Sequence, residues 1–255
     1  MPRLAFPLAL VAALSACRSA PPSPAAPPPD AAAHAPELPA CAPPDVRVVP
    51  AANGAPGATL VLLHGYGATA GDILPVARAL ARGVPALAVL VPDGCDRWEA
   101  GPSGRQWFSL RDVRDEERAP RVAEAGARVS RFVEAELPRR GLPTERVAYA
   151  GFSQGAMIAE WLAVHGAPRP IAVVAFSGRY DDASPVARTG GAPVLIVHGE
   201  QDPRIAFAEA DRAAAALVAR GVRVERLTRP QMGHAMDEAS IDGATAFFAR
   251  ELAAK

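Results

Sequence analysis

The chain has 255 residues, half of them hydrophobic, which is enough to bury a substantial core and predicts one globular domain or at most two. Acidic and basic residues balance at 27 each, so no basic surface points to nucleic acid as a partner. Lys255 is the only lysine, which leaves no internal lysine for Schiff-base or Ser/Lys chemistry.

The first 17 residues have the layout of a secretory signal, with a positive charge at Arg3, an apolar run over 4–14 and small residues up to Cys17. A run of about 11 apolar residues is too short to span a bilayer as a helix, which takes about 20. The final residues of this leader, LSAC, resemble the lipobox of bacterial lipoproteins, which implies a lipid anchor on the thiol of Cys17. An ordinary cleaved signal, with Cys17 as a bystander, is the alternative.

Residues 18–44 are mostly Pro and Ala with few large apolar side chains, so they predict an extended, semi-stiff tether. With a lipid anchor on Cys17, the tether would hold an exported protein at a membrane of the bacterial cell envelope. The predicted division is a leader with its lipobox over 1–17, a tether over 18–44 and a folded domain over 45–255.

Two further cysteines, Cys41 and Cys95, remain after the leader. In an exported chain they could form a disulfide. Their spacing does not establish one, and two free or singly buried thiols are an equal alternative.

From residue 45 onward, short aliphatic or β-branched runs alternate with Ala/Arg-rich amphipathic stretches, which predicts an α/β fold with a mostly parallel central sheet flanked by helices. The runs are almost continuously apolar, as is typical of strands buried on both faces. Strands are expected over 46–51, 58–65, 87–94, 146–153, 171–178, 192–200 and 223–228. Helices are expected near 72–82, 120–137, 155–165, 206–220 and 237–253. The charged run over 111–118 predicts a solvated loop.

The glycine-rich turn HGYGATAG, over 64–71, follows the second expected strand and opens a helix. Gly65, Gly67 and Ala70 satisfy the looser GxGxxG/A fingerprint of dinucleotide sites, and Asp93 ends the next strand. The spacing to that acid exceeds the usual ~20 residues, however. Dinucleotide binding is therefore the weaker interpretation of this turn.

A second turn, GFSQG over 151–155, holds Ser153 between two glycines. A serine hydroxyl is a poor nucleophile until a base accepts its proton, and the base needs a carboxylate to orient it. When a GxSxG elbow lies at the carboxyl end of a strand, the acid and then the His are expected to follow it along the chain. Asp202 follows the strand over 192–200, and His234 lies just before the last helix. Ser153, Asp202 and His234 are therefore the predicted catalytic residues.

Other titratable residues fit these roles less well. Glu200 lies at the very end of its strand, and Asp211 falls within a helix. His198 ends a core-facing strand, where a packed and hydrogen-bonded histidine is expected. His165 is expected to be a capping or surface residue near a helix C-terminus.

A tetrahedral intermediate also needs two backbone N–H groups aimed at its oxyanion. One comes from the residue after the nucleophile and one from the loop after an earlier strand. The amides of Gln154 and Tyr66 are the predicted donors, and the neighbouring glycines let both turns approach the substrate closely.

These features resemble the phospholipase/carboxylesterase group of α/β-hydrolases, which includes acyl-protein thioesterases and small bacterial carboxylesterases. The matching stretches are LVLLHGYGATAGDILPVARAL, VPDG, GRQWFSL, YAGFSQGAMIA, FSGRY, PVLIVHGEQDPRI and MGHAM, and they cover most of residues 58–240. The resemblance implies a serine hydrolase with the triad and oxyanion donors named above, and it places Trp107 and Phe108 close to the acyl pocket. Ordinary core packing is the alternative for these two aromatic residues.

The segment over 179–192 is too short for the cap domain that many hydrolases insert at that point, so a shallow, open site is expected. The predicted activity is hydrolysis of carboxylic esters or thioesters of small molecules or lipids through an acyl-enzyme, with no cofactor and no metal. Lysophospholipase, phospholipase or peptidase activity at the cell envelope is an alternative. A non-catalytic envelope lipoprotein that keeps the fold as a binding surface is another. The leader and tether argue against protein depalmitoylation in a cytosol.

Overall fold

The computed structural model describes residues 42–184 and 190–254. The predicted leader, the anchor on Cys17 and nearly all of the tether lie outside the described residues. Cys95 is disulfide-bonded, and since its partner also lies outside them, a pairing with Cys41 stays a prediction. In the described part of the chain, no helix combines the length and the apolar character needed to cross a membrane.

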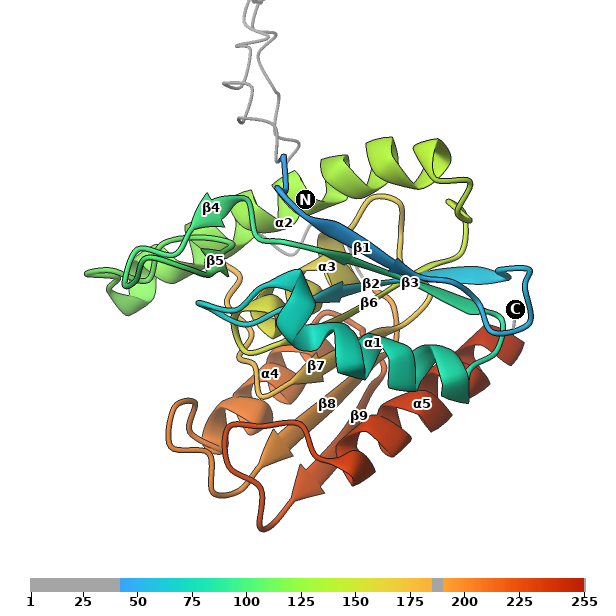
Figure 1. Cartoon of the computed structure of the whole chain (residues 1–255). Coiled ribbons are helices and arrows are strands. Elements are labelled where there is room, and N and C mark those ends of the chain that lie inside the picture. Colours follow the sequence, from blue (N-terminus) through green and yellow to red (C-terminus); the bar gives the residue numbers. More distant parts are fainter. Residues whose placement is uncertain (1–41, 185–189, 255) are drawn as a thin grey trace, which may run out of the picture. The chain divides into compact units, whose positions relative to one another are not determined.

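Within the described residues, a seven-stranded sheet in the order β1-β3-β2-β6-β7-β8-β9 forms the centre of the domain (Figure 1). Along this sheet β1 is antiparallel to β3, and the other neighbours are parallel. The strands are β1 (Val46–Val49), β2 (Ala58–Leu63), β3 (Leu87–Pro92), β6 (Val147–Phe152), β7 (Val173–Phe176), β8 (Val194–Gly199) and β9 (Val224–Arg229). All of these strands lie where the sequence predicts them, and the α/β prediction is confirmed. A separate small hairpin of β4 (Asp96–Arg97) and β5 (Arg105–Gln106) was not predicted.

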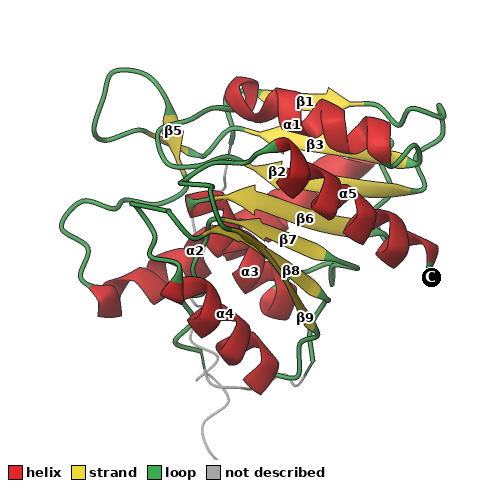
Figure 2. Cartoon of the chain, turned by 90° about the horizontal axis from the view of Figure 1, so that it is seen from below, coloured by secondary structure: helices red, strands yellow, loops and turns green. Residues whose placement is uncertain are grey.

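Helices cover both faces of the sheet (Figure 2). On one face, α1 (Ala70–Gly83) and α5 (Glu238–Ala253) pack against strand residues such as Leu60 and Val174. On the other, α2 (Asp115–Arg139), α3 (Gln154–His165) and α4 (Ala208–Ala219) enclose the opposite side chains of the same strands. Residues 154–164 of α3 are buried on every side, so this helix is surrounded by protein, as its apolar sequence requires.

The prediction of a loop over the whole run 111–118 is wrong, because α2 begins at Asp115. Three acidic residues, Asp115, Glu116 and Glu117, occupy the first turn, where carboxylates are stabilised by the positive end of the helix dipole. Arg118 adds a pair with Asp115 at 2.8 Å, three residues apart on the helix surface. The charged residues that predicted a solvated loop therefore form the first turn of a helix.

The strand order changes direction between β2 and β6, which are parallel neighbours. From β2 the chain next pairs outward with β3, whereas β6 leads to β7, β8 and β9 on the other side. In open α/β sheets, ligands bind beyond the carboxyl ends of the strands at such a point. The loop after β2 and the turn after β6 therefore meet where a site is expected.

Candidate active site

Ser153 stands in a sharp turn between β6, which ends at Phe152, and α3, which begins at Gln154. Its backbone has φ 54° and ψ −114°, a sparsely populated conformation for a residue with a side chain. The flanking glycines make the turn feasible: a Cβ on Gly151 would lie 2.1 Å from the Gly155 carbonyl oxygen, and one on Gly155 would lie 2.3 Å from that of Leu63. The chain thus holds a strained serine at the end of a buried strand.

His234 and Asp202 come together as the sequence predicts, from the loops after β9 and β8. His234 Nδ1 lies 2.8 Å from Asp202 Oδ2, and the Phe152 ring is centred 4.9 Å from the imidazole. Asp202 Oδ1 accepts hydrogen bonds from the backbone N–H groups of Arg204 and Ile205 at 2.8 and 2.9 Å. Burial raises the pKa of Asp202, but these hydrogen bonds and that from His234 outweigh it and leave the pKa below its usual range. Asp202 is therefore a fixed, ionised acceptor for His234.

The alternative acids lie elsewhere. Glu200 is exposed at the end of β8. Asp211 lies in α4, where its carboxylate pairs with Arg226 at 2.5 Å. Neither contacts His234 in the described structure, so Asp202 alone of the three acids has the expected partner.

The alternative bases are held in other contacts. His198 is buried in β8, where its Nε2 lies 3.0 Å from the Ile205 carbonyl oxygen and 3.5 Å from Asp202 Oδ2. This packed, hydrogen-bonded state is the one expected from its position. His165 is the last residue of α3, and its Nε2 lies 2.7 Å from Asp182 Oδ2.

The loop after β2 lies against the serine turn. A Cβ built on Gly65 would be 3.4 Å from that of Ser153 and 3.1 Å from the Phe152 ring. Among the described residues, the backbone N–H groups of Tyr66 and Gln154 have no recorded hydrogen-bond acceptor. The amide of Gln154 is also the first of α3, at the positive end of the helix dipole. Both predicted oxyanion donors thus flank Ser153, and their role stays a prediction.

Trp107 and Phe108 are buried in the core, at 2% and 6% exposure, and they do not line the cavity beside Ser153. The side chain of Gln154 holds their backbone: Oε1 accepts from Trp107 N at 2.9 Å and Nε2 donates to Phe108 O at 2.8 Å. The indole Nε1 of Trp107 donates to His64 O at 2.9 Å. The structure therefore places these aromatics behind the site, and contact with an acyl chain stays a prediction.

Replacing Gln154 with alanine is expected to lower the free energy of unfolding by about 2–6 kcal/mol. The change leaves one buried backbone donor and one buried acceptor unpaired, and each costs about 1–3 kcal/mol. Equilibrium unfolding in urea measures the loss. Gln231→Ala, at an exposed loop position, is the matched control. A loss equal to that of the control would show that water replaces both hydrogen bonds.

Glu99 is a residue of this region that the sequence analysis missed. Its Oε1 accepts from Tyr66 Oη at 2.8 Å and from the backbone N–H groups of Leu110 and Arg111 at 2.8 and 2.9 Å, and Oε2 accepts from Ser109 Oγ at 2.5 Å. Burial raises the pKa of Glu99, but the hydrogen bonds dominate and lower it to about 2. One carboxylate thus ties the loop after β2 to the segment over 109–111. A lone Glu in a loop carries no motif that would reveal this.

Glu99 should make stability depend on acid. Its pKa is about 2 in the folded chain and near 4.5 in an unfolded one, so the unfolded state takes up the proton first as pH falls. The stabilisation is complete above about pH 4.5 and is lost as the pH falls toward 2. The difference in unfolding free energy between wild type and Glu99→Gln should therefore shrink from pH 7 to pH 3.

Urea unfolding at several pH values measures this difference. Glu116→Gln is the control, because the Glu116 side chain is 65% exposed. A gap between wild type and Glu99→Gln that stays constant over the whole pH range would show that the carboxylate is not preferentially ionised in the folded chain.

A cavity of about 750 Å³ lies beside the serine, and Ser153, His234, Tyr66 and Gln154 all line it. Apolar residues form part of its wall, namely Leu110, Val113, Met157, Ile205 and Ala206. Between β7 and β8, the described residues contain no helix or strand that could act as a cap. The site is therefore an open cavity with an apolar wall next to the strained serine.

The dinucleotide interpretation of the turn after β2 finds no support in its geometry. Asp93 Oδ1 accepts from the backbone N–H of Ala70 at 2.6 Å, so this acid occupies the start of α1. Thr69 and Asp72 add a capping box at the same helix end. The helix N-terminus that would receive a pyrophosphate is already satisfied by protein groups. Across residues 42–184 and 190–254, no three His, Cys, Asp or Glu side chains are grouped so that they could hold a metal ion.

Comparison with known proteins adds sequence and fold relationships to this geometry. The model of a family described as phospholipase/carboxylesterase matches residues 44–251. Esterase YpfH of Escherichia coli (strain K12) is 30% identical over 184 residues, which are 71% of this chain and 78% of that protein. The crystal structure of esterase PE8 has a TM-score of 0.70 and 28% identity, covering 81% of this chain and 97% of that one. The Bacillus cereus carboxylesterase shares the fold, with a TM-score of 0.68 and 20% identity over 81% of this chain and 93% of that one.

Proposed function

Because the chain belongs to the phospholipase/carboxylesterase family and is a carboxylic ester hydrolase, we propose that it cleaves carboxylic esters or thioesters through an acyl-enzyme on Ser153. The observation that carries this proposal is the shared cavity. Ser153 lines it together with His234, whose other ring nitrogen is held by Asp202. Nucleophile, base and orienting acid are the parts that acyl transfer requires.

The geometry suits one assignment of roles. Since Asp202 accepts from Nδ1 of His234, the neutral imidazole carries its lone pair on Nε2, where it can accept the Ser153 proton. Ser153 Oγ then attacks the carbonyl carbon, and the amides of Tyr66 and Gln154 stabilise the oxyanion. His234 returns the proton to the leaving alcohol or thiol. Water deprotonated by His234 releases the acid and restores Ser153.

Labelling with a fluorophosphonate tests this proposal directly, because such reagents phosphonylate an activated serine. A single adduct on Ser153, found by mass spectrometry of the digested full chain, is the expected result. Prior incubation with a p-nitrophenyl ester should slow the labelling. Absence of an adduct on Ser153, together with background ester hydrolysis, would contradict the proposed mechanism.

We also propose that the enzyme is exported and anchored at the cell envelope through a lipid on Cys17. The sequence LSAC at the end of the leader and the Pro/Ala-rich stretch after it support this placement. When the full chain is produced in a bacterium, it should partition into the detergent phase of a Triton X-114 extract, and Cys17→Ala should move it to the aqueous phase. If both forms partitioned equally, the lipid anchor would be contradicted and the leader would be an ordinary cleaved signal.

A further inference from the structure

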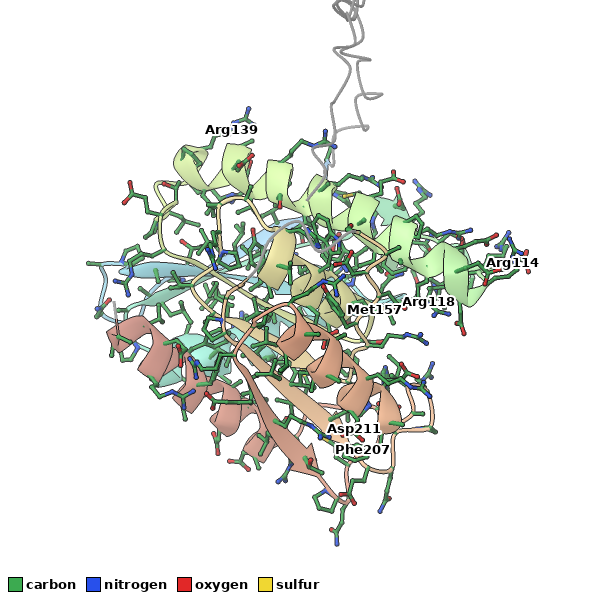
Figure 3. All side chains as sticks on the ribbon, turned by 180° about the vertical axis from the view of Figure 1, so that it is seen from behind. Arg114, Arg118, Arg139, Met157, Phe207 and Asp211 are labelled. Atoms are coloured by element: carbon green, nitrogen blue, oxygen red, sulfur yellow. The ribbon has the colours of Figure 1, made fainter. Side chains whose placement is uncertain are left out.

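The wall of the cavity beside Ser153 is rich in arginine. Apart from His234, its charged side chains are Arg118, Arg179, Arg204 and Glu209. Arg118 lies in the first turns of α2 and borders the cavity together with Met157 of α3, and both labels lie close together in Figure 3. Three guanidinium groups thus share the space beside the serine with one carboxylate.

One largely buried acid, Asp181, is shared between two of these arginines. Asp181 lies 3.8 Å from Arg118 Nη1 and 3.1 Å from Arg179 Nε. Its side chain is 9% exposed, against 14% for Arg118 and 25% for Arg179. A single carboxylate therefore sits between two guanidinium groups and neutralises at most one of them.

The remaining acids near the cavity do not neutralise the other arginine charges. Asp115, which pairs with Arg118, is 80% exposed, and so exposed a pair is largely screened by water. Glu209 contacts the outer Arg212 and is 3.8 Å from Arg179. Among the residues that the structure describes, Arg204 forms no ion pair.

Counting every partner, four arginines (118, 179, 204 and 212) face three acids (115, 181 and 209). Each guanidinium carries five N–H donors, and these ion pairs engage only Nη1 of Arg118 and Nε and Nη2 of Arg179. The remaining donors suit bidentate binding of a carboxylate or phosphate, which is stronger in a partly enclosed site than in bulk water. The excess positive charge also attracts anions into the cavity.

We propose that the preferred substrate is a negatively charged ester, with a carboxylate or phosphate held by Arg118, Arg179 and Arg204 and a short apolar segment between this group and the scissile carbonyl. The apolar segment would lie against Leu110 and Met157, which line the same cavity. This inference rests on the proposed ester hydrolysis at Ser153, and it adds the charge of the substrate.

Two esters that differ only in charge test the inference with the full chain. These are the mono-4-nitrophenyl ester of adipic acid and the same compound with its free carboxylate methylated. At low salt, kcat/KM should be about 10–100 times higher for the anionic ester, which corresponds to about 1.4–2.7 kcal/mol. The preference should decrease as salt is added, because exposed charges are screened.

A second pair of esters, 3-butanoyloxybenzoate and its methyl ester, places the charge on the leaving group. A further ester, 3-butanoyloxyphenyl phosphate, replaces the carboxylate with a phosphate.

Arg204→Gln and Arg179→Gln should each reduce the ratio of anionic to neutral kcat/KM about tenfold, and the neutral ester reports whether the variant is folded and active. Arg114→Gln is the matched control, because Arg114 lies outside the cavity lining, at the start of α2, and is 69% exposed (Figure 3). Equal rates for anionic and neutral esters, or a preference unchanged in both variants, would overturn the inference while leaving ester hydrolysis intact. Failure to cleave any of these esters would overturn the proposed function as well.

Discussion

Ser153→Ala is expected to lower kcat/KM for p-nitrophenyl esters by at least about a thousandfold, because the variant has no hydroxyl to form the acyl-enzyme. Some catalysis above water should remain, since the cavity and the two amides proposed to bind the oxyanion do not depend on the side chain. Alanine also fits the turn, as it adds no atom beyond Cβ to a position that already holds one. The measurement is hydrolysis of an acetate-to-palmitate ester series by wild type and variant.

Ser103→Ala is the control, because Ser103 is exposed and does not line the cavity. Its rates should match those of wild type. The acyl length at which wild type is fastest will also measure how far the apolar wall extends from Ser153. If Ser153→Ala hydrolysed these esters as fast as wild type, another nucleophile or direct attack by water would have to carry the reaction.

Asp202→Asn should reduce kcat by about 10⁴, the scale typical of losing the orienting acid of a Ser-His-Asp triad. The two backbone N–H groups of Arg204 and Ile205 require an acceptor at Oδ1, so the new amide must present its NH2 group to His234. That group donates to Nδ1 and forces the ring proton onto Nε2. The imidazole then has no lone pair to accept the Ser153 proton.

The pattern of kinetic constants distinguishes this explanation from loss of structure. Since Asp202 does not line the cavity, KM should change far less than kcat. Asp211→Asn, at the alternative acid, is the matched control and should keep nearly full activity. If Asp202→Asn were nearly as active as wild type while Asp211→Asn was not, the acid would have been assigned wrongly.

The sequence was sufficient to predict the sheet and the order of the candidate site. Buried parallel strands are marked by continuous apolar runs, and the residue following such a run lies at one common edge of the sheet. For this reason Ser153, Asp202 and His234 could be expected to come together although up to 81 positions separate them.

Residues that act through hydrogen bonds across loops could not be predicted in this way. The Glu99 carboxylate accepts from two separate stretches, the loop after β2 and residues 109–111, and nothing in the sequence next to Glu99 indicates this. The position of Arg118 could not be predicted for a different reason. A charged run is normally solvated, whereas here α2 places Arg118 in the wall of the cavity. Trp107 and Phe108 are buried outside the lining of this cavity, and their contact with an acyl chain stays a prediction, because the family resemblance alone does not say which side chains face the substrate.

The residues around the cavity come from two kinds of element, and this affects how the selectivity of the enzyme can evolve. Ser153 and the loops carrying Asp202 and His234 follow the carboxyl ends of β6, β8 and β9, so the positions of the proposed catalytic residues depend on the central sheet. Leu110, Val113 and Arg118 instead belong to one continuous stretch that runs from the loop after β5 into the first turn of α2. Exchanging that stretch with a relative's would alter which esters are chosen without rebuilding the chemistry, so substrate range and catalytic rate can evolve as separate traits.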